Sequence, residues 1–317
     1  MDEPNALMRW VMFHFAGGDA LFVGLLAILA ISFVPESPRS AGRWTLLTLL
    51  ALIWGGLSSP AWPIRMLLLA GTLILLWRIV IHVRGRSSPA VGLMTWSVRL
   101  VLAATIVLET SMLRNRIESA PPDRLCVIAD SITAGLNDGE LTWPRRLSEQ
   151  TGIDVRDAAQ PGATLRSALE QADLLGDDRS PLVLEIGGND LLSGLPVAEF
   201  RRDCEALCRK VCTPGRIVWM CELPLPPFCS RYGSEQRRIC RQQGIRLIPK
   251  RKLMRLLTTS GATVDSIHLS TQGQESFCRL IMREIGAAAN VSPGAYEHCE
   301  RRRIGRESSE VESPRTE

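Results

Sequence analysis

Three side chains of this sequence have the types that nucleophilic catalysis by a serine requires. Ser131 follows an apolar run at residues 125–129, so we expect it at the end of a strand and the start of a helix, where a helix N-terminus favours negative charge. Asp265 and His268 lie three residues apart near the end of the chain. A carboxylate holds the imidazole tautomer whose other nitrogen faces a serine hydroxyl. The pattern predicts Ser131 as nucleophile, His268 as its base and Asp265 as the orienting carboxylate.

Acyl chemistry at a serine also needs hydrogen-bond donors for the developing oxyanion. Gly162 in QPGAT allows a backbone N–H to approach a substrate closely, and Asn189 in EIGGND offers an amide NH₂. With the backbone N–H of Ser131 these residues make three candidate donors. Taken singly, a serine after a strand is a common helix cap and GGND is a common turn. Because separate segments supply complementary roles, we favour the catalytic interpretation.

The elements that must position these residues follow a regular alternation. Apolar runs predict strands, and helix-like stretches follow them along the chain. We expect strands at residues 125–129, 153–156, 182–186, 217–221 and 246–248, and helices at residues 143–150, 165–175, 197–211, 234–243 and 272–285. This alternation predicts an α/β fold with a parallel sheet between two layers of helices. Active sites of such sheets form at the carboxyl ends of the strands, where the candidate residues fall.

The first third of the chain has a different composition. Four apolar stretches lie at residues 20–34, 44–57, 66–83 and 91–108. A bilayer-spanning helix needs roughly 20 mainly apolar residues, so we expect an α-helical transmembrane region of about four spans. Apolar runs that repeat over about a hundred residues differ from the single short core of a signal peptide. Arg78 and Arg99 are costly in hydrocarbon, so they should snorkel or face the bundle interior.

The chain is therefore divided into four parts by composition. We expect a transmembrane region at residues 1–113, a linker at 114–124, a catalytic domain at 125–290 and a disordered charged tail at 291–317. Arginines flank the apolar stretches almost equally on both sides, so the positive-inside rule gives no orientation. An even number of spans places the N-terminus and the catalytic domain on the same side of the membrane. We expect that side to be extracytoplasmic.

Charge and cysteine content narrow the range of partners. The formal net charge of +4 is too small for a nucleic-acid-binding surface. Cys204, Cys208 and Cys212 recur every fourth residue in a stretch that we expect to be helical. They allow either a metal site or a buried apolar stripe, and we favour the stripe because no histidine accompanies them. We expect no metal and no cofactor, and the sequence does not assign disulfide pairs among the nine cysteines.

Four segments carry a resemblance to a known family. ADSITAG, QPGAT, GGND and DSIH resemble, in the correct order, the conserved blocks of the SGNH (GDSL-like) hydrolases, with closest similarity to small bacterial thioesterase and lysophospholipase-like members. The resemblance covers roughly residues 125–285. It implies a three-layer αβα, flavodoxin-like domain that hydrolyses a carboxylic ester through an acyl-enzyme, without a cofactor. It says nothing about the multi-span region, which we expect in a bacterial cell membrane.

Carried over to this sequence, the blocks imply the same roles as the residue types. Ser131 resembles the nucleophile, Asp265 and His268 the remaining catalytic pair, and Gly162 and Asn189 the oxyanion donors. The first block has one departure. Ala129 stands where the family usually has glycine, and its extra methyl group could crowd the turn. No reacting group is removed, so we expect activity to survive.

Other functions remain open from sequence. The same site could transfer the acyl group to an acceptor other than water, and an inactivated domain could bind a ligand or partner without turnover. The apolar bundle could instead be a transporter or sensor with a regulatory domain, although it lacks paired carboxylates and broken helices. If the protein is a hydrolase, a lysophospholipid, a fatty-acyl ester and an acetylated saccharide all fit a membrane-anchored site. The oligomeric state is not determined by the sequence.

Overall fold

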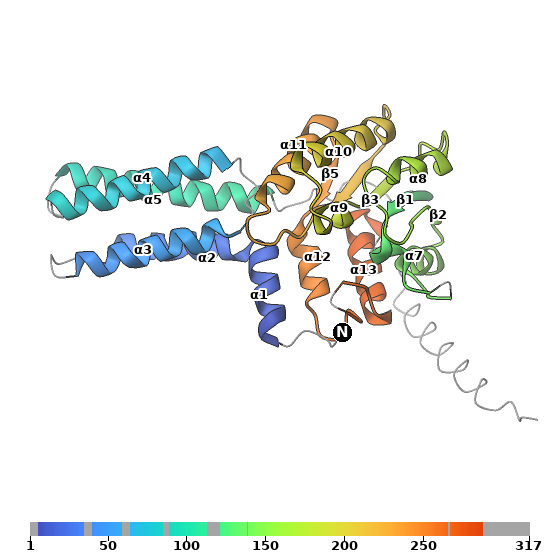
Figure 1. Cartoon of the computed structure of the whole chain (residues 1–317), viewed down its shortest axis with the longest axis horizontal. Helices are drawn as coiled ribbons and strands as arrows, with labels where there is room; N and C mark the ends of the chain where they lie inside the picture. The colour runs from blue at the N-terminus through green and yellow to red at the C-terminus, as the bar shows by residue number, and fades with distance from the viewer. Residues whose placement is uncertain are drawn as a thin grey trace, which may run out of the picture.

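A five-stranded parallel sheet forms the centre of the C-terminal part of the molecule (Figure 1). The computed structural model describes residues 6–34, 40–58, 64–84, 89–112, 121–137, 139–265 and 267–287. The strands are β1 (Arg124–Ala129), β2 (Asp154–Asp157), β3 (Leu182–Glu185), β4 (Val218–Cys221) and β5 (Arg246–Ile248). Their order in the sheet is β2-β1-β3-β4-β5, with every pair parallel. The predicted α/β fold with a parallel sheet is confirmed.

Helices cover both faces of this sheet. They are α6 (Ser131–Ala134), α7 (Trp143–Thr151), α8 (Ala168–Leu175), α9 (Gly188–Leu192), α10 (Val197–Val211), α11 (Ser230–Gln243), α12 (Lys250–Leu257) and α13 (Thr271–Glu284). Because successive side chains of a strand point to opposite faces, Cys126 and Ile128 pack in one apolar layer with α8, α10 and α11. Leu125 and Val127 pack in the other layer with α7, α12 and α13.

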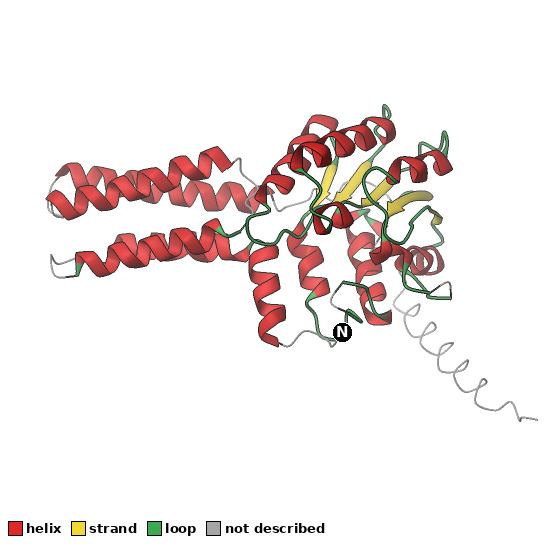
Figure 2. Ribbon diagram, viewed as in Figure 1, coloured by secondary structure: helices red, strands yellow, loops and turns green. Residues whose placement is uncertain are grey.

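The N-terminal part is a bundle of long helices that projects from the α/β domain (Figure 2). It contains α2 (Asp19–Phe33), α3 (Ala41–Gly56), α4 (Ile64–Arg84) and α5 (Pro89–Met112). Each predicted apolar stretch corresponds to one of these helices. A further helix, α1 (Ala6–Ala16), precedes them and was not predicted. The chain bends by 74° between α1 and α2.

The bundle is apolar both inside and outside. Ile28, Trp77 and Leu102 are buried in its interior, whereas leucines such as Leu50 and Leu100 are exposed on its outer surface. Within the described residues, one helix, Val91–Ser111, is long and apolar enough to cross a membrane, or two if the bent α1–α2 pair counts as one span. The expectation of about four spans exceeds this finding and stays a prediction.

Arg78 of α4 and Arg99 of α5 are held by neighbouring helices. Arg78 is only 2% exposed and donates to the carbonyl oxygen of Ala41 at 3.0 Å and to the hydroxyl of Thr45 at 2.9 Å. Arg99 donates to the carbonyl oxygen of Ser32 at 2.6 Å, near the end of α2. The carbonyl of Ser32 is among those at a helix end, which lack partners within their own helix. The prediction that such arginines face the bundle interior is confirmed for Arg78.

The bundle contacts the α/β domain directly. Met12 and Phe13 of α1 pack against the apolar layer that contains α12. Arg251 of α12 pairs with Asp19 at the start of α2, with 2.9 Å between Nη2 and Oδ1. The linker predicted at 114–124 lies largely outside the described residues, as does the whole tail predicted at 291–317. The connection between the two parts therefore includes packed helices as well as the intervening chain.

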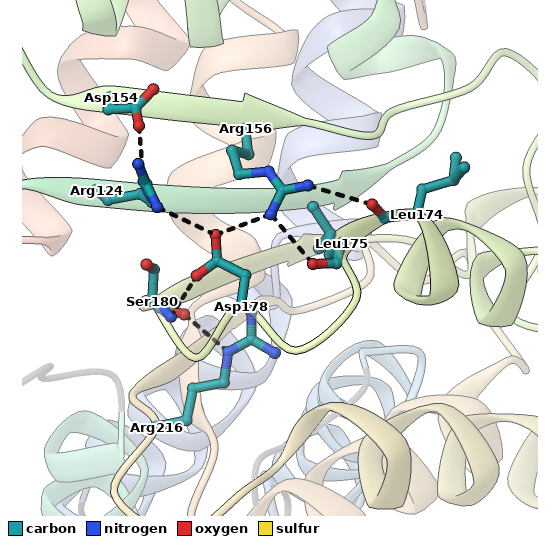
Figure 3. A network of polar contacts seen from close by, with 8 residues as sticks. All are labelled: Arg124, Asp154, Arg156, Leu174, Leu175, Asp178, Ser180 and Arg216. Carbon is teal, nitrogen blue, oxygen red and sulfur yellow. Dashed lines mark hydrogen bonds and ion pairs between the residues drawn. The ribbon is translucent and has the colours of Figure 1, made fainter.

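The amino-terminal edge of the sheet carries a network of ion pairs (Figure 3). Arg124 bonds to Asp154 at 2.6 Å, and Asp178 accepts from Arg156 at 3.1 Å. Hydrogen bonds from Ser180 and from Arg156 outweigh burial and hold the pKa of the Asp178 carboxyl well below its ordinary value. This network joins the starts of β1 and β2 to the segment before β3. It lies at the opposite edge from Ser131.

Candidate active site

The end of β1 places Ser131 at the carboxyl edge of the sheet. The side chain of Asp130 accepts a hydrogen bond from the backbone N–H of Ile132 at 3.0 Å and caps α6, which begins at Ser131. The side-chain amide of Gln171 bonds to both the N–H and the carbonyl oxygen of Ala129, each at 3.0 Å. The backbone before the serine is thus fixed from two sides.

The structure brings Ser131, His268 and Asp265 into one hydrogen-bonded chain. His268 Nε2 lies 3.1 Å from Ser131 Oγ, and His268 Nδ1 lies 2.6 Å from Asp265 Oδ2. Asp265 Oδ1 also accepts the backbone N–H of His268 at 2.8 Å. Partial burial acts to raise the pKa of Asp265, but the hydrogen bonds from His268 outweigh it and lower that pKa. The carboxylate is therefore ionised near neutral pH and fixes the tautomer of the ring.

The two remaining donor candidates also come together. Asn189 Nδ2 donates to the carbonyl oxygen of Ala163 at 2.9 Å, which attaches the start of α9 to the loop containing Gly162. Gly162 has a φ of +73°, a conformation that favours glycine. A primary amide has two N–H bonds, so Asn189 retains one for a ligand. A second tether runs from the backbone N–H of Leu165 to Asp190 Oδ2 at 2.9 Å.

A buried pair of acids behind Ser131 was missed by sequence reasoning. Asp130 and Glu185 lie at the ends of neighbouring strands, and the Asp130 N–H donates to the Glu185 carbonyl oxygen at 3.1 Å. The signal of this pair in the sequence is a glutamate inside the apolar run LVLEI.

Burial of this acid pair favours its protonated form. Thr133 donates to Glu185 Oε2 at 3.1 Å, which acts to lower the pKa of Glu185, and accepts from the indole of Trp143 at 2.9 Å. Burial raises the pKa of both carboxyls, and the charge of Asp130 raises that of Glu185 further. The pair therefore retains a proton at pH values where a solvated pair would be fully ionised.

Ala129, which stands in place of the family's usual glycine, lies before the turn. Ala129 is the last residue of β1, and it does not have the positive φ that would favour glycine. Its methyl group is fully buried in the apolar layer that contains Trp143 and Leu147. Alanine is accommodated because the turn begins only after this residue.

The cysteine stripe is part of the core. Cys204 and Cys208 are fully buried against the sheet, as predicted, whereas Cys212 is half-buried. A hydrogen bond with Cys204, together with burial, raises the pKa of the Cys208 thiol. In the part of the chain that the structure describes, no group of three or more His, Cys, Asp or Glu side chains is arranged to hold a metal ion.

Part of the chain matches the model of a known protein family. The model of the GDSL-like Lipase/Acylhydrolase family matches residues 130–275, a range that includes all five candidate site residues. Among curated proteins, the chain is 30% identical over 119 residues to Esterase TesA of Pseudomonas aeruginosa. The match covers 35% of this chain and 59% of TesA, which is less than two thirds of that relative.

Solved structures give similar partial matches. A psychrotrophic esterase, EstA from Pseudoalteromonas sp., in a structure inhibited by monoethylphosphonate, is 23% identical with a TM-score of 0.47. That match covers 53% of this chain and 99% of EstA. The crystal structure of TesA is 26% identical with a TM-score of 0.44, and the match covers 51% of this chain and 97% of that structure.

Proposed function

We propose, from the GDSL-like hydrolase domain that this chain contains, that the protein is a membrane-anchored enzyme that hydrolyses carboxylic esters through an acyl-enzyme at Ser131. The observation that carries this proposal is the hydrogen-bonded chain from Ser131 through His268 to Asp265, with distances of 3.1 and 2.6 Å. A hydroxyl, a base and an orienting carboxylate in this order are the parts that activate a serine.

The geometry supports a two-step reaction. Ser131 Oγ attacks the ester carbonyl carbon while His268 Nε2 takes its proton, and Asp265 stabilises the imidazolium that forms. In this proposal the N–H groups of Ser131 and Gly162 and the side-chain amide of Asn189 donate hydrogen bonds to the developing oxyanion. Collapse of this intermediate breaks the ester C–O bond, and His268 donates its proton to the leaving alcohol. Water, deprotonated by His268, then attacks the acyl-enzyme and releases the carboxylic acid.

Membrane anchoring is supported by the outer surface of the bundle. Large apolar side chains are exposed along it, among them Leu26, Leu50, Ile79, Trp96 and Leu100. Soluble proteins rarely expose apolar surface of this extent. Helices α4 and α5 contain 21 and 24 residues. At about 1.5 Å per residue they are roughly 31 and 36 Å long, enough to cross a hydrocarbon layer of about 30 Å.

The same side of the membrane is proposed for the N-terminus and the hydrolase domain. Helix α1 packs on α12 of the α/β domain, in keeping with an even number of spans. We assign that side as extracytoplasmic. We also propose that the protein is a multi-pass protein of a bacterial cell membrane. Protease treatment of intact cells tests the assignment, because an extracytoplasmic hydrolase domain is cleaved and a cytoplasmic one is protected.

The enzymatic proposal is tested with the full chain in detergent. Hydrolysis of p-nitrophenyl esters of increasing acyl length is compared between the parent protein, Ser131→Ala and the control Ser234→Ala, which alters a half-buried serine of α11. We expect Ser131→Ala to lose at least about 10³-fold in kcat/KM and the control to lose little. A reactive phosphonate should add to the parent and not to Ser131→Ala. Equal activity in the parent and Ser131→Ala would rule out Ser131 as the nucleophile.

Anchoring is tested separately by extraction of membranes with alkaline carbonate. We expect the full chain to stay in the membrane pellet, since spanning helices are not removed by high pH. Release into the supernatant would contradict anchoring and leave the hydrolase proposal in place.

A further inference from the structure

An exposed phenylalanine lies on a strained turn of the α/β domain. Residues Pro226 to Cys229 form a tight turn in which the N–H of Cys229 donates to the carbonyl oxygen of Pro226 at 3.2 Å. Phe228 occupies the third position with a φ of 71°, and in the described part of the chain it is the one residue other than glycine with a positive φ. Proline before a positive φ is the pattern of a type II turn, which favours glycine at that position. Phe228 is nevertheless 88% exposed.

Other large apolar side chains are exposed on the same edge of the sheet. We call them, with Phe228, the apolar rim: Leu136, Leu192, Phe228, Val264 and Ile267, which are between 41% and 88% exposed. Leu136 follows β1 and α6, and Leu192 ends α9, which follows β3. Val264 and Ile267 are next to the candidate catalytic pair in the sequence. The rim therefore occupies segments that surround the carboxyl edge, where Ser131 lies.

This edge also adjoins the helical bundle. Glu222 directly follows β4, and its Oε2 accepts the backbone N–H of Lys250, at the start of α12, at 3.0 Å. A Cβ at Gly18, in the bend between α1 and α2, would lie 3.5 Å from Cε of Lys250. Figure 1 shows the connection from β4 to α11, which bears Phe228, on the side of the domain that faces the bundle.

The bend between α1 and α2 has the features of a membrane boundary. Trp10 stacks on His14 with 4.8 Å between ring centroids, and the indole of Trp54 donates to His14 at 3.0 Å. Aromatic rings of this kind concentrate at headgroup level. On α5, Glu109 lies 20 residues after Pro89, and at about 1.5 Å per residue this is roughly 30 Å, the thickness of the hydrocarbon layer.

We propose that Phe228 inserts into the surface of the bilayer that holds the bundle, and that the site takes a long-chain amphiphilic acyl ester from that bilayer. The proposal rests on the anchored ester hydrolase proposed above and defines its substrate class. The rest of the apolar rim lines the route of the acyl chain from the bilayer to Ser131. The leaving alcohol carries the polar headgroup and departs into water, and the released fatty acid returns to the bilayer.

Substitutions in the rim test this proposal in the full chain reconstituted into phosphatidylcholine vesicles. The rates for vesicle-embedded p-nitrophenyl palmitate and for soluble p-nitrophenyl acetate are measured with Phe228→Ser and with Leu192→Ser/Ile267→Ser. We expect kcat/KM for the palmitate to fall on the order of 10-fold or more, because each variant loses apolar contact with the chain or the bilayer. For Phe228→Ser we expect the rate for the acetate to stay within about 2-fold of the parent, and for the double variant we expect it to fall less than the rate for the palmitate.

Two further variants separate function from folding. Leu174→Ser changes a leucine that is 63% exposed on α8, outside the rim, and should leave both rates unchanged. Phe228→Gly relieves the positive φ, so thermal stability should not fall while the palmitate rate still does.

Each outcome distinguishes the two proposals. Equal losses on both esters, or no loss on the palmitate, would overturn the role of the rim. A parent that hydrolyses the acetate in a Ser131-dependent way but ignores the palmitate would overturn the substrate class and leave the hydrolase proposal standing. If Ser131→Ala retains full activity on both esters, the proposed function itself fails.

Discussion

The two edges of the sheet place carboxyl groups in opposite environments. At the amino-terminal edge, Asp178 accepts hydrogen bonds from Ser180 and from Arg156, and its pKa is well below the ordinary value (Figure 3). At the carboxyl edge, Asp130 and Glu185 are buried beside each other, and burial raises the pKa of both. The first edge stabilises its charge, whereas the second makes charge unfavourable.

The difference between the two edges shows that energetically unfavourable features are concentrated at the carboxyl edge. A buried acid pair, a positive φ at Phe228 and exposed apolar side chains all occur at the carboxyl edge. Strain and perturbed titration tend to gather at functional sites, because the rest of the fold must compensate for them. We therefore expect substitutions at the carboxyl edge to alter activity more than stability, and substitutions at the amino edge to do the reverse.

The largest expected effect is that of Asp265→Asn at the carboxyl edge. The amide no longer fixes the imidazole tautomer that lets His268 Nε2 accept the proton of Ser131. We expect kcat for p-nitrophenyl acetate to fall on the order of 10³–10⁴-fold with little change in melting temperature. Steady-state kinetics and thermal unfolding of the full chain in detergent measure both. A loss below about 10-fold would show that Asp265 does not orient the base.

Asn189→Ala is expected to have the next largest effect. Removal of one oxyanion donor typically costs about 10²–10³-fold in kcat. The amide also bonds to the carbonyl oxygen of Ala163 at 2.9 Å, so a change in the nearby loop must be distinguished from loss of the donor. Asp190→Asn provides the comparison, since its side chain holds the same region through Leu165 without being a donor candidate. If both variants lose activity equally, Asn189 acts through loop position.

At the amino edge, Asp178→Asn should reduce stability and leave activity intact. We expect the free energy of unfolding at pH 7 to fall by about 2 kcal/mol, because the variant loses charge-assisted hydrogen bonds with Arg156. The pKa of Asp178 is lowered, so its contribution is present above roughly pH 4, the ordinary carboxyl range, and is lost as the pH falls below it. Denaturant titration in detergent at pH 7 and pH 3 measures the difference.

A matched control lies in the same network. Asp154 pairs with Arg124, but both side chains are more than half exposed, so Asp154→Asn should cost less than about 0.5 kcal/mol. An effect of Asp154→Asn equal to that of Asp178→Asn would contradict the assignment of the stabilisation to the less exposed carboxylate.

The amino-acid sequence predicts the sheet well because the three central strands β1, β3 and β4 are short apolar runs. The predicted helix at 197–211 has the bounds of α10, and the predicted strand at 246–248 those of β5. Helix α12 was missed because KRKLMRLL begins with three basic residues, and only its second half contains the buried apolar residues Leu253, Met254, Leu256 and Leu257. A helix of eight residues is too short for its apolar spacing to stand out in the sequence.

The candidate site was partly predictable for a similar reason. The blocks around Ser131 and His268 are local in sequence, and their residue types indicate which catalytic role each residue can have. The pairing of Asp130 with Glu185 depends on which strands are neighbours, and the orientation of the bundle depends on the contact between α1 and α12. Long-range contacts of this kind leave no local pattern in a single sequence.

The smallest expected effect is the pH dependence that the buried pair of Asp130 and Glu185 gives to the free energy of unfolding. The pKa of Asp130 is raised to about 6, so the pair favours folding below the ordinary carboxyl range, and this contribution is lost as the pH rises through about 6. We expect the free energy of unfolding of the parent to decrease by about 1–2 kcal/mol between about pH 4.5 and pH 7 from this pair. Asp130→Asn keeps the acceptor for Ile132 but cannot ionise, so it should remove the part of that decrease that comes from Asp130 and leave the part that comes from Glu185, whose pKa burial also raises.

Comparison with Asp178→Asn then separates the pH-dependent stability contributions of the two edges of the sheet. That variant retains the acid pair, so it should keep the decrease between about pH 4.5 and pH 7 while losing stability that the parent has above roughly pH 4. The two variants should change the slope of unfolding free energy against pH in opposite directions. That result would follow only if one carboxyl is stabilised as an anion and the other as an acid. Identical pH profiles for the two variants would mean that the edges do not differ in this way, and that the acid pair behind Ser131 ionises like a solvated one.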